Sequence, residues 1–183
     1  MSTLPTLLAP IITDQPSQEV FGYTDAVQAA VEAAGYDIVE RNDQKPWGAY
    51  LRFNGNNADE FVRDFFTDLS PEDARLGNPD AELSPKLLIV SPGARLSLQT
   101  HERRAERWLF LTPGSYYKSL TDDPGELQHA QPGEIVQFAR GETHRLCGND
   151  AGFVLVAEIW QHSDPTQLSD EDDITRLHDD YSR

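Results

Sequence analysis

The sequence predicts an all-β domain with helical additions, and three observations support this fold class. The chain after Pro85 consists of short segments rich in β-branched and aromatic residues, a composition that favours strands. Glycines at 93, 114, 125, 133, 141 and 152 separate these segments at intervals of 8 to 21 residues, which is typical of a β-sandwich or barrel. The helical patterns all lie before Pro85. The expected strands are KLLIVS, AERWLFL, YYKSL, EIVQFA and FVLVAEIW.

Residues 1–44 are expected to form an N-terminal arm followed by a helix. Residues 1–20 contain prolines and are interpreted as irregular. The Ala-rich run TDAVQAAVEAA predicts a helix over 24–34, with Thr24 as its N-cap and Gly35 ending it.

Residues 45–84 are expected to form one strand and a helical insertion. KPWGAY leads into a strand that ends at Phe53. Asn57, with Glu60 in a capping-box arrangement, predicts a second helix with a phenylalanine-rich face, and Ser70-Pro71 starts a short third one. The insertion at 57–77 is either a lid over a site or a buttress for the sheet.

Residues 85–183 are expected to form the barrel core and an acidic tail. At 183 residues the chain suits one domain spanning 1–183, with a core of useful size.

The charge distribution and the composition exclude several classes of protein. A net charge of −16 argues against nucleic-acid binding, which needs Lys and Arg to neutralise phosphates. The excess is uneven: residues 86–145 hold 8 basic and 7 acidic residues, so an anionic small substrate remains compatible with the barrel. The sequence contains no apolar run long enough for a membrane span. One cysteine, Cys147, and no basic residue before Arg41 fit a cytoplasmic protein without a signal peptide.

Four side chains with metal-binding chemistry lie in two glycine-punctuated blocks. Gln99 and His101 are two residues apart, so on an extended strand they share a face. The polar residues 102–104 can form a turn that sets Glu106 on a neighbouring strand facing the same interior. His144 lies in the second block. Two imidazoles, a carboxylate and an amide oxygen would leave coordination positions open, as catalytic metal sites do.

These blocks resemble the two motifs of the cupin superfamily, with Gln99 where the first motif more commonly has His. More narrowly, LSLQTHERRAERW (96–108) resembles the signature of type II mannose-6-phosphate isomerases. Lys86, the segment 45–50 and the tail 171–183 resemble further parts of that family. The sequence departs from it at Glu102, Arg103 and Arg107, where the family has His, at Ala139, where it has Pro, and at Ser182, where it has Gly.

The resemblance implies a cupin-type double-stranded β-helix, a jelly-roll barrel with N-terminal helices, which forms a homodimer. It also implies a metal-dependent aldose–ketose isomerase acting on a sugar phosphate, with Arg104 and Lys86 as catalytic or phosphate-contacting residues. Zinc is the first expectation for the metal, with manganese, cobalt, iron or nickel as alternatives. Two rival functions stay open: a non-catalytic module that binds metal and sugar, and an iron-dependent cupin dioxygenase.

Overall fold

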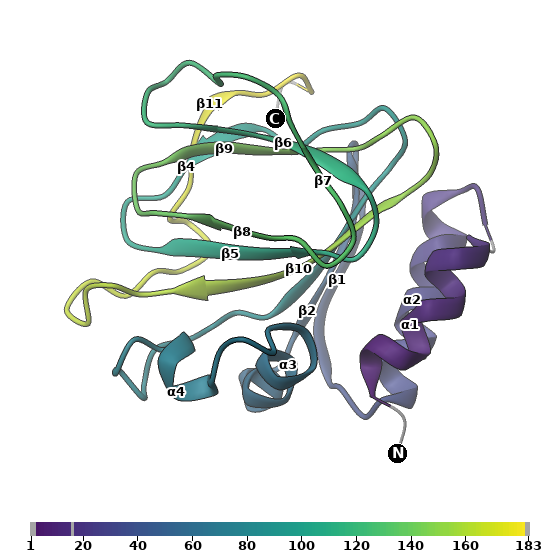
Figure 1. Ribbon diagram of the computed structural model, residues 1–183, viewed down its shortest axis with the longest axis horizontal. Helices are drawn as coiled ribbons and strands as arrows, with labels where there is room; N and C mark the ends of the chain where they lie inside the picture. Colours follow the sequence, from purple (N-terminus) through teal and green to yellow (C-terminus); the bar gives the residue numbers. More distant parts are fainter. Residues whose placement is uncertain (1–2, 16, 182–183) are drawn as a thin grey trace.

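Two antiparallel β-sheets face each other, and helices lie on the outer side of the larger one (Figure 1). The computed structural model describes residues 3–15 and 17–181. Within these residues, sheet A has six strands, in the spatial order β1 (Ile38–Lys45), β2 (Gly48–Phe53), β3 (Lys86–Val90), β10 (Val154–Gln161), β5 (Ala105–Phe110) and β8 (Ile135–Phe138). Sheet B has five, in the order β11 (Thr175–His178), β4 (Leu98–Thr100), β9 (Thr143–Cys147), β6 (Gly114–Ser119) and β7 (Gln128–Ala130).

The central strands of sheet A are buried on both faces. Every residue of β3 and β10 is buried, which explains why their sequences are nearly continuous apolar runs. Alternate residues divide between two cores: Leu87 and Ile89 pack outward under the helices, whereas Leu88 and Val90 pack inward against sheet B. Even-numbered residues of β3, β5 and β10 therefore point between the sheets, and this parity decides which polar side chains reach the interior.

The structure corrects the expectation that residues 1–20 are irregular. Helix α1 spans Leu4–Asp14 and fully buries Leu4 and Leu8, which lie one turn apart. Pro5 stands in the first turn, where its missing N–H is not needed, and Pro10 is accommodated inside the helix. The free energy gained by burying the two leucines therefore outweighs the tendency of the prolines to disfavour a helix.

Helix α2 spans Val20–Ala33 and begins before the predicted cap. The Thr24 hydroxyl donates to the carbonyl of Val20 at 2.7 Å, so it bonds within the helix instead of capping it. Gly35 follows the helix with φ of +89°, a left-handed conformation suited to the expected stop.

The structure contains a strand that the sequence analysis missed. Strand β1 pairs with β2 in a hairpin whose turn ends at Gly48. This glycine has φ of +144°, and a Cβ there would lie 2.0 Å from the carbonyl oxygen of Ile89. The close approach of β2 to β3 thus requires glycine at this position.

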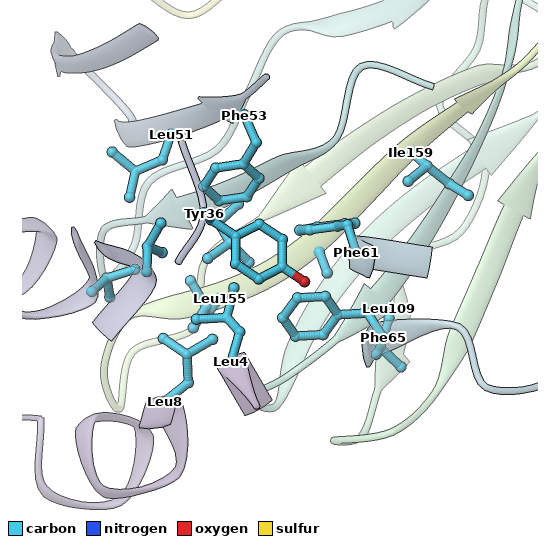
Figure 2. Packing of buried hydrophobic residues seen from close by; sticks show 14 of the residues in the cluster. Leu4, Leu8, Tyr36, Leu51, Phe53, Phe61, Phe65, Leu109, Leu155 and Ile159 are labelled. Atoms are coloured by element: carbon cyan, nitrogen blue, oxygen red, sulfur yellow. The ribbon is translucent and has the colours of Figure 1, made fainter. Parts of the chain in front are cut away.

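The helical insertion is a buttress and not a lid. It contains the short 3-10 helix η1 (Gly55–Asn57), α3 (Ala58–Phe65) and α4 (Pro71–Ala74). Figure 2 shows Phe61 and Phe65 of α3 beside Leu109 and Ile159, on the outer face of sheet A. The expected Asn57–Glu60 capping box does not form, because the Asn57 side chain accepts the backbone N–H of Asp37 instead. Helix α4 begins where the sequence predicts a short helix, and the Ser70 hydroxyl caps it by accepting the N–H of Asp73 at 3.0 Å.

The jelly-roll arrangement with N-terminal helices confirms the predicted fold class. After an irregular acidic segment at 169–173, the chain adds β11, which pairs with β4. Ser182 and Arg183 of the family-like tail lie outside the described residues. Among the described residues, none of the helices has the length and apolarity needed to cross a membrane.

Candidate metal centre and cavity

Three of the four proposed ligands converge between the two sheets. Glu106 is on the inner face of β5 in sheet A, His144 is on β9 in sheet B, and His101 immediately follows β4. The turn after β4 thus carries the chain across to the opposing sheet. The expected neighbouring-strand arrangement is wrong in that respect, although Glu106 does face the shared interior.

The two imidazoles flank one carboxylate. His101 Nε2 lies 3.0 Å from Glu106 Oε1, and His144 Nε2 lies 3.3 Å from Glu106 Oε2. Each of the three side chains is at most 2% exposed. One ligand atom from each residue lies within 4.8 Å of the others, a spacing that suits a shared cation.

The other ring nitrogens orient the imidazoles. His101 Nδ1 lies 2.5 Å from the backbone oxygen of Asp173, and His144 Nδ1 lies 3.1 Å from that of Glu142. A carbonyl only accepts, so each Nδ1 carries a proton and donates it. This leaves Nε2 as the nitrogen that faces Glu106. Metal-binding histidines in proteins are held in the same way.

The chemistry of these atoms fits a divalent cation. Glu106 Oε2 and His144 Nε2 are buried and have no hydrogen-bond partner among the described residues. Burial alone would raise the pKa of Glu106, but His101, His144 and Arg104 together hold it well below its ordinary value. An ionised carboxylate together with two imidazole nitrogens provides the donor set that zinc and related metals prefer.

Gln99 lies beside this group. Its Cα is paired with that of His144 across β4 and β9, and its side chain is 9% exposed. The amide oxygen accepts the Ser97 hydroxyl at 3.0 Å. Gln99 and Glu106 line the same cavity, whose volume is about 310 Å³.

Arg104 is buried and fully engaged with protein groups. Its Nε donates to Glu106 Oε1 at 3.0 Å, and its Nη1 donates to the backbone oxygen of Asp173 at 2.9 Å. The guanidinium also stacks 4.0 Å from the ring of Trp160. Arg104 therefore fixes the charge and position of Glu106.

Lys86 lies on the inner face of β3 and contacts acidic residues of the cavity wall. Its ammonium lies 2.9 Å from Glu171, 3.8 Å from Glu158 and 4.1 Å from the centre of the Trp160 ring. It lines the same cavity as Gln99 and Glu106.

Two functional candidates escaped the sequence analysis. Glu158 projects into the cavity from β10, and burial, with the charge of Glu106, raises its pKa to about 7 despite Lys86 and Arg104. A single acidic residue in the apolar run FVLVAEIW was the available signal. Asp173 accepts the backbone N–H groups of Glu102 and Arg103. It lies in the tail 171–183 that resembles the family, but nothing in the sequence indicated its contacts with residues 102 and 103.

Comparison with known proteins supports the cupin resemblance. The family described as mannose-6-phosphate isomerase C-terminal matches residues 79–179. The alginate biosynthesis protein AlgA of Pseudomonas aeruginosa is 34% identical over 98 residues, which cover 54% of this chain and 19% of AlgA. This chain therefore spans a small part of the length of that relative.

A solved structure from Staphylococcus aureus shares the fold at low sequence identity. The capsular polysaccharide assembling protein CapF of Staphylococcus aureus superposes with a TM-score of 0.52 and 15% identity, over 87% of this chain and 41% of CapF. A Cupin 2 conserved barrel domain protein of Salinispora arenicola has a TM-score of 0.37 and 15% identity, over 43% of this chain and 62% of that one.

Proposed function

Because the chain belongs to the mannose-6-phosphate isomerase C-terminal family of cupins, we propose that it is a metal-dependent aldose–ketose isomerase of a sugar phosphate. Mannose 6-phosphate and fructose 6-phosphate are the substrate pair that the family suggests. The observation that carries the proposal is the buried His101–Glu106–His144 group, whose unpartnered atoms lie beside a cavity lined by ionisable side chains. This combination suits proton transfer next to a carbonyl.

His101, Glu106 and His144 would hold the cation, with the Gln99 amide oxygen as a fourth ligand. A divalent metal held there would polarise the sugar carbonyl and stabilise negative charge on the adjacent oxygens. Zinc is our first expectation, and manganese, cobalt, iron and nickel are compatible with the same donors. The carbonyls that accept from His101 and His144 keep both rings oriented.

Arg104 and Lys86 set the electrostatics of the site. Arg104 keeps Glu106 ionised by direct contact at 3.0 Å, so its role is to support the ligand carboxylate. Lys86 places a buried positive charge beside Glu158 and Glu171. A developing negative charge in the cavity is stabilised by such fixed cations.

We assign binding of the substrate's phosphate group to Lys45 and Arg176, because Arg104 and Lys86 already contact acceptor groups of the protein. Both line the cavity; Lys45 is partly exposed and Arg176 is exposed. Within the described residues neither lies within ion-pair distance of an acidic group. Two uncompensated cations in a strongly acidic chain are suited to an anionic group of the substrate.

Metal analysis combined with an isomerase assay tests this function. Protein loaded with zinc, manganese, cobalt, iron or nickel should hold about one metal per chain and interconvert the two sugar phosphates. Glu106→Gln should lose both properties, because the amide supplies no negative charge. Glu102→Gln, an exposed neighbour, is the matched control and should keep both.

The same assay separates the rival functions. Absence of turnover with every one of these metals would end the isomerase proposal. Sugar-phosphate binding without turnover would instead identify a non-catalytic metal- and sugar-binding cupin. Oxygen consumption that requires iron would identify a dioxygenase.

A further inference from the structure

We infer that Glu158 is the catalytic carboxylate that carries the proton between the two adjacent carbons of the sugar. This inference rests on the proposed isomerase function and adds the acid–base group that function needs. Glu158 lies at the middle of β10, where its Cα is paired with Lys86 on one side and with Trp108 on the other. All three side chains point between the sheets.

One oxygen of Glu158 is fixed and the other is left for a substrate. Oε2 accepts the indole N–H of Trp108 at 2.9 Å. Oε1 lies 3.8 Å from the Lys86 ammonium, beyond hydrogen-bond distance, and accepts no hydrogen bond from the described residues. The residue is 6% exposed and lines the cavity that also contains Gln99 and Glu106. Trp108 thus holds the carboxylate in place while Oε1 remains available.

The other carboxylates of the cavity wall are already engaged. Glu106 contacts His101, His144 and Arg104. Glu171 is half exposed and pairs with Lys86, and Glu40 accepts from Tyr50 and Arg52. Among the described residues that line the cavity, Glu158 is the buried carboxylate with no cation within hydrogen-bond distance.

The electrostatic surroundings support a proton carrier. The charged groups that face Glu158 are Lys86, Arg104, Glu106 and Glu171. Burial and the charge of Glu106 raise the pKa of Glu158 to about 7, against the lowering effect of the two cations. A general base works best when its pKa lies near the working pH.

The proton transfer balances without a further reactant. Ionised Glu158 takes the proton from C2 of the open-chain aldose. The C–H electron pair forms a C1–C2 double bond, and the carbonyl electrons move to O1, giving an enediolate. Glu158 then returns the proton to C1, the proton on O2 passes to O1, and the carbonyl re-forms at C2. The products are the ketose and the original carboxylate.

The test compares Glu158→Gln, Glu158→Asp and wild type, each loaded with metal. Glu158→Gln should lower kcat about 1,000-fold, within the range for loss of a general base. Its metal content should be unchanged and its KM should stay within about threefold. Incorporation of deuterium from D2O into the sugar, followed by NMR, should fall in parallel. The kcat of Glu158→Asp should lie between those of Glu158→Gln and wild type. Glu82→Gln, at an exposed side chain before β3, should match wild type.

Three outcomes would overturn the inference. The first is a metal-loaded Glu158→Gln protein with kcat within tenfold of wild type. If that variant does not fold, Glu158→Asp decides, and a kcat within twofold of wild type overturns the assignment. A wild-type protein without isomerase activity would reject the proposed function and this inference with it. An active wild type together with an active Glu158→Gln would reject only the role of Glu158 and leave the isomerase function standing.

Discussion

Glu106 and Glu158 are two buried carboxylates on one face of sheet A with opposite electrostatic surroundings. The pKa of Glu106 is held well below its ordinary value against the effect of burial, because two imidazoles and Arg104 contact it. Burial and the negative charge of Glu106 raise the pKa of Glu158 to about 7. Surroundings that shift the pKa values of two carboxylic acids in opposite directions are typical of sites where one group binds charge and the other transfers protons.

The raised pKa of Glu158 predicts a stability that depends on pH. In the unfolded chain this carboxyl titrates near its ordinary value of 4.5, but in the folded protein it holds its proton to about pH 7. Its contribution to the free energy of unfolding is therefore fully present below pH 4.5 and is lost as the pH rises through 7.

Metal-free Glu158→Gln should consequently melt higher than wild type at pH 8. The difference should be smaller at pH 5, where Glu158 of the folded wild type keeps its proton and is neutral like the glutamine. Melting temperatures of both proteins at the two pH values, with chelator present, measure this effect. Glu82→Gln serves as the control, and a difference in melting temperature that does not change with pH would contradict the prediction.

At the scale of elements, the acidic segment at 169–173 fastens the turn that carries His101 and Arg104. The Asp173 carboxylate accepts the backbone N–H groups of Glu102 and Arg103 and the hydroxyl of Ser169. Its own carbonyl accepts from His101 and Arg104. A segment about 70 residues away in sequence thus orients one proposed ligand and the arginine beside another.

Asp173→Asn should weaken both stability and metal binding. Burial would raise the pKa of Asp173, but the bonds from Ser169, Glu102 and Arg103, with Arg104, lower it overall. The stability that the Asp173 carboxylate contributes is therefore present above its unfolded-state pKa of 3.8. It is lost as the pH falls through its lower folded-state pKa. At pH 7 the substitution should cost about 1–3 kcal/mol. Metal affinity should fall about tenfold, as it does when other residues that hydrogen-bond a metal ligand are replaced.

Denaturant titration and metal titration measure these two effects. The exposed neighbour substitution Asp172→Asn should change neither. Wild type and Asp173→Asn should converge in stability in acid, where the carboxyl of wild type becomes protonated. Equal stability of the two proteins at pH 7 would show that the segment does not fasten the turn.

Elements with a strong local pattern could be predicted from the sequence, and those that depend on distant pairing could not. The apolar strands after Pro85 and the motif positions of His101, Glu106 and His144 follow from short-range spacing. The inward direction of Glu158 needs the strand order β3-β10-β5, which pairs Glu158 with Lys86 and Trp108, both far from it in sequence. Helix α1 could not be predicted, because the prolines in its sequence indicate irregular structure, whereas the burial of Leu4 and Leu8 against other elements decides its structure.

At the scale of the whole molecule, the net charge of −16 makes the position of the unpaired cations important. An acidic protein repels a phosphorylated sugar, so binding requires local positive charge at the cavity. Lys45 comes from the end of β1 in sheet A and Arg176 from β11 in sheet B. The two sheets therefore each contribute one cation to the proposed phosphate site.

Replacing these cations should weaken binding of phosphorylated ligands selectively. Arg176→Gln and Lys45→Gln should each raise the KM for the sugar phosphate about tenfold, since each removes one charge-assisted contact of about 1.4 kcal/mol. Metal content should not change. Inhibition by inorganic phosphate should weaken by the same factor. Arg63→Gln, an exposed arginine on α3, is the matched control. An unchanged KM in both variants would place the phosphate elsewhere.

A bound metal should also tie the two sheets together. Glu106 belongs to sheet A, whereas His144 belongs to sheet B and His101 follows a strand of sheet B, so a shared ion would cross-link the barrel between its layers. Metal at about 100 times its Kd adds about 2.7 kcal/mol to the folded state. For a chain of this size that raises the melting temperature by about 5–10 °C. Scanning calorimetry with zinc and with chelator measures the shift. Glu106→Gln should melt at the same temperature under both conditions, whereas Glu102→Gln should respond like wild type. A metal-dependent shift that persists in Glu106→Gln would place the ion outside the barrel interior.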